Sequence, residues 1–217
     1  MALETNKLIV GLGELLWDLL PAGPQLGGAV TNFAVMAGRL GDRAVPASRI
    51  GKDDLGHQAR ARLTRLPVDL SFLQVDPEHP TGSVSVVLRE AQPEYVIHSP
   101  AAWDFLELTP QWQDLAQRAD AVCFGSLAQR SPVSRKTIQG FLAATSPECV
   151  RIFDVNLRRP FYSTEVIQQS LESTTILKMN DAELPLVLDL LGLPREASGS
   201  PLEALLIRGS RLLLGCF

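Results

Sequence analysis

The stretch GGAVTNFAVMAGRLG, residues 27–41, holds a glycine pair, a helix-forming run and a closing glycine. Gly27 and Gly28 stand where a helix would begin and Gly41 where it would end, so we expect a helix between them. Paired glycines let a ligand approach the backbone closely, and free amides at a helix start favour hydroxyl or phosphate oxygens. Asn32, one turn into the helix, is able to donate and accept hydrogen bonds toward a polyol. On spacing alone, an ordinary tight loop-to-helix turn explains the stretch equally well.

Short apolar segments alternate with helical patterns along the rest of the chain. Such alternation is typical of a mainly parallel sheet flanked by helices. In two segments, 82–89 and 95–98, apolar and polar residues instead alternate in part with a period of two. The turn residues Gln92 and Pro93 lie between the segments, so we predict a β-hairpin with its turn at that pair. The expected strands are 7–11, 45–50, 120–124, 150–155 and 175–179, and the expected helices besides the first are 54–66, 110–119, 132–144, 164–173 and 181–191.

Composition limits the class of protein. The 217 residues carry a net charge of -4, with 46% hydrophobic and 20% charged residues, which is ordinary for a globular domain. This charge gives no basic surface for nucleic acid or an anionic membrane. The three cysteines and three histidines lack metal-ligand spacing, so we expect no direct metal ligands. The chain starts without a signal-peptide pattern and has no apolar run long enough to cross a bilayer, so we expect a cytoplasmic protein.

Two later segments carry polar groups at places where α/β proteins bind ligands. The segment IFDVNLRRP, residues 152–160, reads as a strand followed by Asp154, Asn156 and Arg158, which would lie at the carboxyl edge of the sheet. Taken alone, the simpler interpretation is that Asp154 caps the next loop. In KMNDAE, residues 178–183, Asn180 and Glu183 have the spacing of a capping box at a helix start.

These segments together resemble the motifs of ribokinase-like, PfkB-type carbohydrate kinases, and fructokinases in particular. Residues 27–41 resemble the sugar-binding signature near the N-terminus of that family. GELLWD (13–18) is similar to the family's first strand with its substrate-binding aspartate, and IGKDDLG (50–56) to its IGxDxxG turn. Residues 152–160 resemble the DxNxR motif of fructokinases, and 178–183 the KxNxxE segment beside the phosphates and the magnesium water shell.

The resemblance implies a fold and an activity. The fold would be a three-layer α/β sandwich with a mainly parallel sheet, forming one domain over 1–217 with β-lid elements around 15–27 and 80–99. The activity would be ATP-dependent phosphorylation of a sugar hydroxyl, on fructose or a similar ketose. Ribokinase, nucleoside kinase and ketodeoxygluconate kinase specificities remain alternatives within the family. Trp103, which follows the second lid element, is interpreted as a packed core aromatic and not as a sugar platform.

The resemblance also implies site residues, cofactors and partners. ATP and Mg²⁺ would be the cofactors, a small sugar the ligand, and a homodimer through the lid the assembly, with neither nucleic acid nor membrane as a partner. It leaves open whether Arg158 meets the sugar or the phosphate. The residues implied on the sugar side are Asp18, Gly27, Gly28, Asn32, Asp154, Asn156 and Arg158, and those on the phosphate and metal side are Lys178, Asn180 and Glu183.

The second family signature, DTxGAGD, does not occur in these 217 residues. In the family its last aspartate is the general base and its glycine turn the anion hole, so no catalytic base is assigned. We expect a loop at 194–201, a helix–strand unit at 202–207, a strand beginning at 211–214, and a fold that is incomplete at the C-terminus. Little or no kinase activity would follow. Two alternatives are a non-catalytic sugar-binding or regulatory protein and a chain that does not fold stably.

Overall fold

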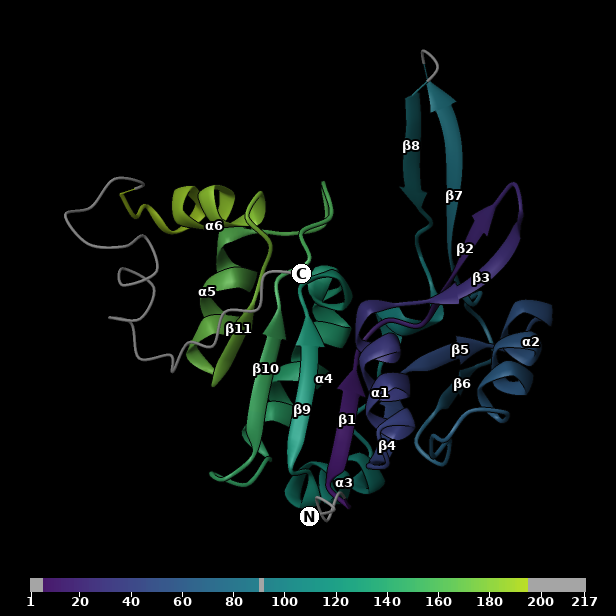
Figure 1. Ribbon diagram of the computed structural model, residues 1–217, viewed down its shortest axis with the longest axis horizontal. Coiled ribbons are helices and arrows are strands. Elements are labelled where there is room, and N and C mark those ends of the chain that lie inside the picture. The colour runs from purple at the N-terminus through teal and green to yellow at the C-terminus, as the bar shows by residue number, and fades with distance from the viewer. Residues whose placement is uncertain (1–5, 90–91, 195–217) are drawn as a thin grey trace.

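The computed structural model describes residues 6–89 and 92–194 of the chain, drawn in colour in Figure 1. Its main sheet has five strands in the order β11-β10-β9-β1-β4, and each neighbouring pair is parallel. This arrangement confirms the predicted α/β fold with a mainly parallel sheet. The strands are β1 (Leu8–Leu12), β4 (Arg43–Ala47), β9 (Ala121–Gly125), β10 (Val150–Asp154) and β11 (Ile176–Lys178).

Helices lie on both sides of the main sheet (Figure 1). Every helix predicted before residue 192 is present, and the largest difference is that α2 ends at Leu63 and not near Leu66. The first turn of α2 is capped by Asp53, whose Oδ1 accepts the amide of Gly56 at 2.7 Å. The α-helices are α1 (Ala29–Arg39), α2 (Asp54–Leu63), α3 (Pro110–Arg118), α4 (Pro132–Ala143), α5 (Thr164–Glu172) and α6 (Glu183–Leu191), and two 3₁₀ helices are η1 (Ala102–Phe105) and η2 (Leu127–Arg130).

A second, four-stranded sheet projects from the main body, with its hairpin extending at the upper right of Figure 1. We call it the small sheet; its order is β3-β2-β7-β8, from β2 (Leu16–Leu20), β3 (Gly23–Gly27), β7 (Gly82–Arg89) and β8 (Gln92–Ile97). The hairpin of β7 and β8 was predicted, but the turn position was wrong. Gln92 and Pro93 belong to β8, opposite Arg89 and Leu88. Because β8 is an edge strand, a proline without an amide hydrogen is tolerated there.

The single strand predicted at 45–50 is also wrong, because the chain leaves the main sheet in the middle of this run. β4 ends at Ala47, and β5 (Arg49–Gly51) pairs instead with β6 (Gln74–Asp76) as a separate parallel ladder. Between them, the carbonyl of Ser48 accepts the amide of Gln74 at 2.9 Å. All residues from Ala44 to Gly51 are buried, so the apolar run shows no periodicity that would reveal the bend.

The core is divided into a large cluster around the main sheet and a smaller one beneath the small sheet and α2. Trp103 is fully buried in the large cluster, as interpreted from the sequence. In the part of the chain that the structure describes, no helix is long and apolar enough to cross a membrane. The predictions for 195–201, 202–207 and 211–214 lie outside the described residues.

Candidate functional site

A cavity of about 710 Å³ opens between the main sheet and the small sheet. Because the strands of the main sheet are parallel, their carboxyl ends meet at one edge, which is the usual ligand-binding edge of such sheets. This volume lies within the range of small-molecule sites, about 300–1,000 Å³. Its polar lining is Glu14, Asp18, Asn32, Asp154, Asn156, Arg158, Arg159 and Lys178, and the remainder is Leu16, Leu20, Gly28, Ala29, Val84, Tyr95, Ile97 and Leu127.

Asp154 ends β10 and turns its carboxylate into the cavity, where it is 6% exposed. One oxygen, Oδ2, accepts the ammonium group of Lys178 at 2.8 Å. The other, Oδ1, is buried and has no hydrogen-bond partner among the described residues. Burial raises the pKa of Asp154 above its usual value, and the Lys178 charge partly opposes that rise. Buried carboxylate oxygens are normally hydrogen-bonded, so Oδ1 indicates a place for a ligand donor.

Glu14 is a second buried carboxyl group in the same cavity. It follows β1 after Gly13, is 1% exposed, and accepts the amide of Ala29 on Oε1 at 3.0 Å. Its Oε2 is buried without a hydrogen-bond partner among the described residues. Burial raises the pKa of Glu14 to about 7, and the negative charge of Asp154 adds to the effect. Two neighbouring carboxyl groups thus each offer one oxygen without a hydrogen-bond partner in the part of the chain that the structure describes.

The predicted glycine pair makes room for this arrangement. A Cβ atom on Gly27 would lie 2.7 Å from Oδ2 of Asp18, and one on Gly28 would lie 2.5 Å from the carbonyl oxygen of Glu14. Gly28 also has a φ of 109°, which side chains disfavour, and it is the residue before helix α1. One turn later in α1, Asn32 is exposed to the cavity. The glycines therefore let the start of α1 approach the two acidic residues closely.

Three positive side chains line the cavity together with the acidic ones. Burial raises the pKa of Asp18 on β2, and the Arg158 charge opposes that rise, so these two groups interact across the cavity. Arg158 follows Asn156, whose φ of 36° places it in the left-handed region. Arg158, Arg159 and Lys178 form a cationic part of the cavity lining.

Asn180 and Glu183 form the reciprocal hydrogen bonds of a capping box. The amide of Glu183 donates to Oδ1 of Asn180 at 2.9 Å, and the amide of Asn180 donates to Oε2 of Glu183 at 3.0 Å. The other glutamate oxygen, Oε1, accepts the amide of Leu157 at 2.9 Å. Glu183 therefore ties the start of α6 to the loop that carries Arg158. Neither Asn180 nor Glu183 is among the residues that line the cavity.

The structure brings most of the predicted site residues together, and adds others. Within the lining are Asp18, Gly28, Asn32, Asp154, Asn156, Arg158 and Lys178, while Gly27 lies directly beside Asp18. Glu14 and the apolar wall of the small sheet were missed. For Glu14 a signal existed, because a charged residue directly after an apolar strand and a glycine falls at the ligand-binding edge. Among the described residues, no group of three or more histidine, cysteine, aspartate or glutamate side chains is arranged to hold a metal ion.

Comparison with known proteins identifies the family. The model of the "pfkB family carbohydrate kinase" matches residues 24–205, most of the chain. The chain belongs to the pfkB family of carbohydrate kinases. It is 28% identical over 225 residues to a putative sugar kinase of Pyrococcus horikoshii, covering 95% of this chain and 72% of that protein. It is likewise 28% identical over 196 residues to a fructokinase of Solanum tuberosum, covering 83% of this chain and 60% of the fructokinase.

Solved structures of sugar kinases share the fold. The crystal structure of the Pyrococcus horikoshii sugar kinase superposes with a TM-score of 0.78 at 26% identity, covering 88% of this chain and 68% of that one. A fructokinase double mutant of Vibrio cholerae, solved with fructose, ADP and potassium ion bound, superposes with a TM-score of 0.79 at 23% identity. The match covers 98% of this chain and 71% of that one. The pfkB chain described here thus spans roughly two thirds of the length of these relatives.

Proposed function

We propose that the cavity binds a neutral sugar, fructose or a similar ketose, as the substrate side of an ATP-dependent sugar kinase. The observation that carries this proposal is the pair of buried carboxyl oxygens, Oε2 of Glu14 and Oδ1 of Asp154, that have no partner among the described residues. Sugar hydroxyls supply the donors that such oxygens need. Asp18, Gly28 and Asn32 complete the sugar side, each lining the same cavity.

The apolar wall supports a role in excluding water. Val84 and Ile97 lie opposite each other on adjacent strands of the small sheet, and both line the cavity. A sugar bound there would expose its hydroxyls to the carboxyl groups and its carbon skeleton to the wall. In phosphoryl transfer, water must be kept from the transferred phosphate. We therefore assign the small sheet the role of a lid.

The phosphate side is proposed from the cationic lining and from the relatives. The Pyrococcus horikoshii sugar kinase has been solved in complex with ATP, and the Vibrio cholerae fructokinase with ADP. Lys178 and Arg159 provide positive charge that fits a phosphate group. When bound, ATP supplies the phosphoryl group and Mg²⁺ neutralises its charge. Glu183 fits an indirect role through magnesium-bound water, since both of its oxygens already accept backbone amides.

A polypeptide of these 217 residues alone is proposed to bind sugar without robust turnover. No DTxGAGD sequence occurs in it, so it supplies neither the general base nor the anion hole that the family resemblance assigns to that motif. General-base assistance alone is typically worth about 10²–10⁴-fold in rate, and losing the anion hole adds to this. In this polypeptide the described residues would bind and orient the sugar and shield it from water.

The test combines calorimetry with a coupled ADP-release assay on the same 217-residue sample. The calorimetric panel is fructose, ribose, glucose, adenosine and ketodeoxygluconate, and the assay adds Mg-ATP to each sugar. We expect fructose to bind at millimolar or better affinity, and the substitution Asp154→Asn to weaken it about tenfold or more, because a charge-assisted hydrogen bond is lost. Asp114→Asn is the matched control, since Asp114 is an exposed residue of α3.

Each outcome has a defined meaning. Fructose binding that depends on Asp154 but not on Asp114, without turnover, supports both parts of the proposal. Robust ADP release would contradict the expected lack of turnover while leaving the sugar kinase assignment intact. No binding by any sugar in the panel, in a sample with a sharp thermal melt, would overturn the sugar site. Preferred binding of ribose, adenosine or ketodeoxygluconate would replace fructose with that substrate class.

A further inference from the structure

Arg130, the last residue of η2, has a largely buried side chain and is not among the residues that line the cavity. Its side chain is 6% exposed and forms a two-pronged ion pair with Asp104 of η1. Nε donates to Oδ1 and Nη2 to Oδ2, both at 2.8 Å. Such forked pairing fixes the plane of the guanidinium group as well as its position. Arg130 is therefore held in one orientation.

The fixed guanidinium reaches the base of the small sheet. Nη2 of Arg130 also donates to the carbonyl oxygen of His98 at 2.9 Å. His98 directly follows β8, and its Nε2 lies 3.0 Å from the hydroxyl of Ser85 on β7. The end of the β7–β8 hairpin that returns to the main body is thus attached to Arg130.

The same guanidinium lies over two aromatic rings. Its central carbon is 4.0 Å from the ring centre of Trp103 and 4.7 Å from that of Phe161. Phe161 belongs to the segment after β10, and its amide donates to the carbonyl of Arg158 at 2.7 Å. That segment, which we call the arginine loop (residues 156–162), carries Asn156 and Arg158 into the cavity. Arg130 consequently contacts the arginine loop on one side and the hairpin base on another.

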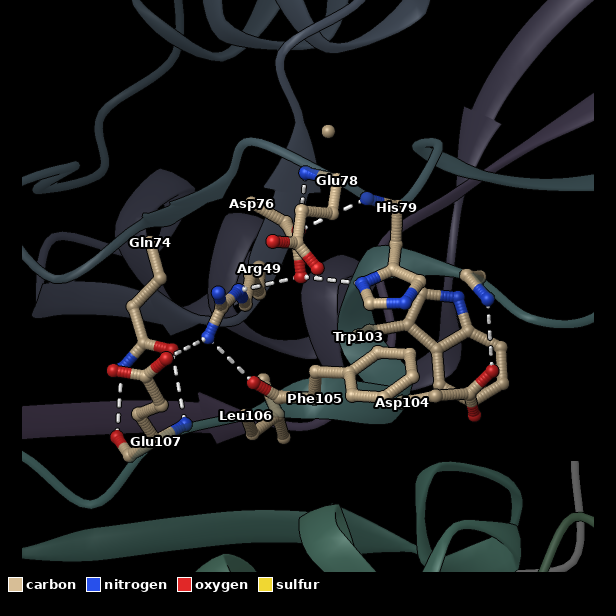
Figure 2. A network of polar contacts seen from close by, with 12 residues as sticks. Arg49, Gln74, Asp76, Glu78, His79, Trp103, Asp104, Phe105, Leu106 and Glu107 are labelled. Atoms are coloured by element: carbon tan, nitrogen blue, oxygen red, sulfur yellow. Dashed lines mark hydrogen bonds and ion pairs between the residues drawn. The ribbon is translucent and has the colours of Figure 1, made fainter.

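The partner of Arg130 is itself anchored to the rest of the molecule. Oδ2 of Asp104 accepts the amide of Ala101 at 2.9 Å. Figure 2 shows η1 next to Arg49, which pairs with Asp76 at 3.1 Å and donates to the carbonyl of Phe105 at 2.6 Å. The ring of His79 stacks on Phe105, with 3.6 Å between ring centres (Figure 2). Asp104 thus presents a rigid base on which Arg130 can be held.

We propose that Arg130 is a positioning residue that couples the base of the β7–β8 hairpin to the arginine loop. The inference rests on the proposed function, because it assigns to this coupling the joint ordering of two walls of the sugar cavity. Arg130 does not touch the sugar in this scheme. It transmits the position of Phe161 to His98, so that a sugar held by the arginine loop also orders the small sheet above it.

The test is amide hydrogen exchange on the full 217-residue chain, with and without fructose, in two windows: 95–98 and 156–162. Arg130→Met is expected to accelerate exchange in both windows of the free protein. Phe161→Leu is the sharper variant, because it leaves the Arg130 pairs with Asp104 and His98 in place. It should accelerate exchange in 156–162 about tenfold, the size expected for a partly buried cation–π contact, and leave 95–98 unchanged. Arg118→Met, which removes an exposed arginine of α3, should change neither window.

With fructose, the wild-type chain should gain protection in both windows. Tyr95 and Ile97 line the cavity, so the sugar protects 95–98 partly by direct contact. In Phe161→Leu the gain at 95–98 should therefore fall to this direct part and be smaller than in the wild type. The coupling is overturned if Phe161→Leu leaves both windows unchanged, or if fructose protects both windows in that variant as in the wild type. If Arg130→Met does not fold, Phe161→Leu still decides the question. If no fructose binding is seen, the proposed sugar site fails, while exchange in the free variants still tests whether Arg130 holds the two segments.

Discussion

At the scale of single residues, the chemistry of the cavity depends on carboxyl groups kept away from water. Burial raises the pKa of Glu14 to about 7 from its ordinary value of 4.5, and the Asp154 charge contributes in the same direction. Near neutral pH, Glu14 therefore holds its proton in a large fraction of molecules. This allows two acidic groups to share one cavity without full mutual repulsion. Glu14 accepts hydroxyl hydrogen bonds when ionised and is able to donate one when protonated.

The substitution Glu14→Gln should remove a pH dependence of stability. Below pH 4.5 both folded and unfolded chains hold the Glu14 proton; between about 4.5 and 7 only the folded chain keeps it. Unfolding is then favoured progressively as the pH rises through this window, by up to about 3 kcal/mol. Glutamine resembles the protonated acid, so Glu14→Gln should gain stability over the wild type between pH 5 and pH 8. Urea denaturation at both values measures this gain.

Glu148→Gln provides the control, because it makes the same chemical change at an exposed residue outside the cavity. Its free energy of unfolding should follow that of the wild type at both pH values. A Glu14→Gln variant whose difference from the wild type is the same at pH 5 and pH 8 would show that Glu14 titrates normally in the folded chain.

Sequence reasoning identified Asp154 and missed Glu14 for a physical reason. Asp154 ends a strand and is followed by further polar residues, so its place at the sheet edge was readable. Glu14 is followed by two leucines and a tryptophan. The whole segment 13–18 was interpreted as one strand, so Glu14 was not recognised as a separate acidic group. Whether a carboxyl oxygen lacks a partner depends on contacts with α1 and β10, which are distant in the sequence. The capping box of Asn180 and Glu183, a purely local feature, was predictable and is confirmed by its hydrogen bonds.

At the scale of elements, the start of α1 controls how closely the helix approaches the acidic residues. Gly28 and Gly23 both have positive φ values, 109° and 114°. A Cβ atom at Gly28 would lie 2.5 Å from the Glu14 carbonyl oxygen, whereas one at Gly23 would have nothing within 4 Å. Comparing alanine substitutions at the two glycines therefore separates the free-energy cost of a positive φ from the cost of close packing against Glu14.

The paired substitutions Gly23→Ala and Gly28→Ala should differ accordingly. Gly23→Ala is expected to cost about 1–2 kcal/mol of unfolding free energy, the typical cost of placing a side chain at positive φ. Gly28→Ala should cost more, because α1 must also move away from Glu14, and it should weaken fructose binding in the calorimetric assay. Thermal and urea denaturation give the first quantity. Equal effects of the two substitutions on both stability and binding would contradict the packing argument.

The elements themselves were largely predictable, because parallel strands and amphipathic helices leave strong local patterns. The exceptions lie where tertiary contacts override those patterns. The run before Gly51 is uniformly buried, so nothing local marks its division into β4 and β5, which pair with different partners. Pro93 has the character of a turn residue, yet the edge position of β8 admits it into a strand.

At the scale of the whole molecule, the cavity exists because the small sheet stands over the carboxyl edge of the main sheet. This placement depends on the parallel pairing of β2 with β7, in which Leu16 lies opposite Gly82. Periodicity alone does not predict a pairing between segments so far apart. The family resemblance supplied the expectation of a lid, while the composition of its cavity face, with Val84 and Ile97, became readable only in the structure.

The small sheet also bears on assembly, and we propose that two copies of the chain associate through it. Tyr95 on the cavity face of β8 is 63% exposed, and Leu19 on β2, on the far side of β7, is 36% exposed. Side chains alternate along a strand, so Leu19 faces away from the cavity that Asp18 and Leu20 line. Each face of the small sheet thus carries a large exposed side chain, Tyr95 on one and Leu19 on the other, that association could cover. Covering the cavity face with a second copy would bury Tyr95 and close the cavity at the same time.

Tyr95→Ser and Leu19→Ser, compared by sedimentation equilibrium, distinguish the two faces of the small sheet. If the cavity face forms the interface, the wild type sediments as a dimer at micromolar concentration. Tyr95→Ser should then raise the dissociation constant about tenfold or more, because aromatic side chains commonly dominate interface energies. Leu19→Ser should leave it nearly unchanged. A larger effect of Leu19→Ser would place the contact on the opposite face, and a monomeric wild type at these concentrations would rule out association through the sheet.

Fructose should strengthen a cavity-face dimer, because binding inside the cavity and covering it are then linked equilibria, each favouring the other to the same extent.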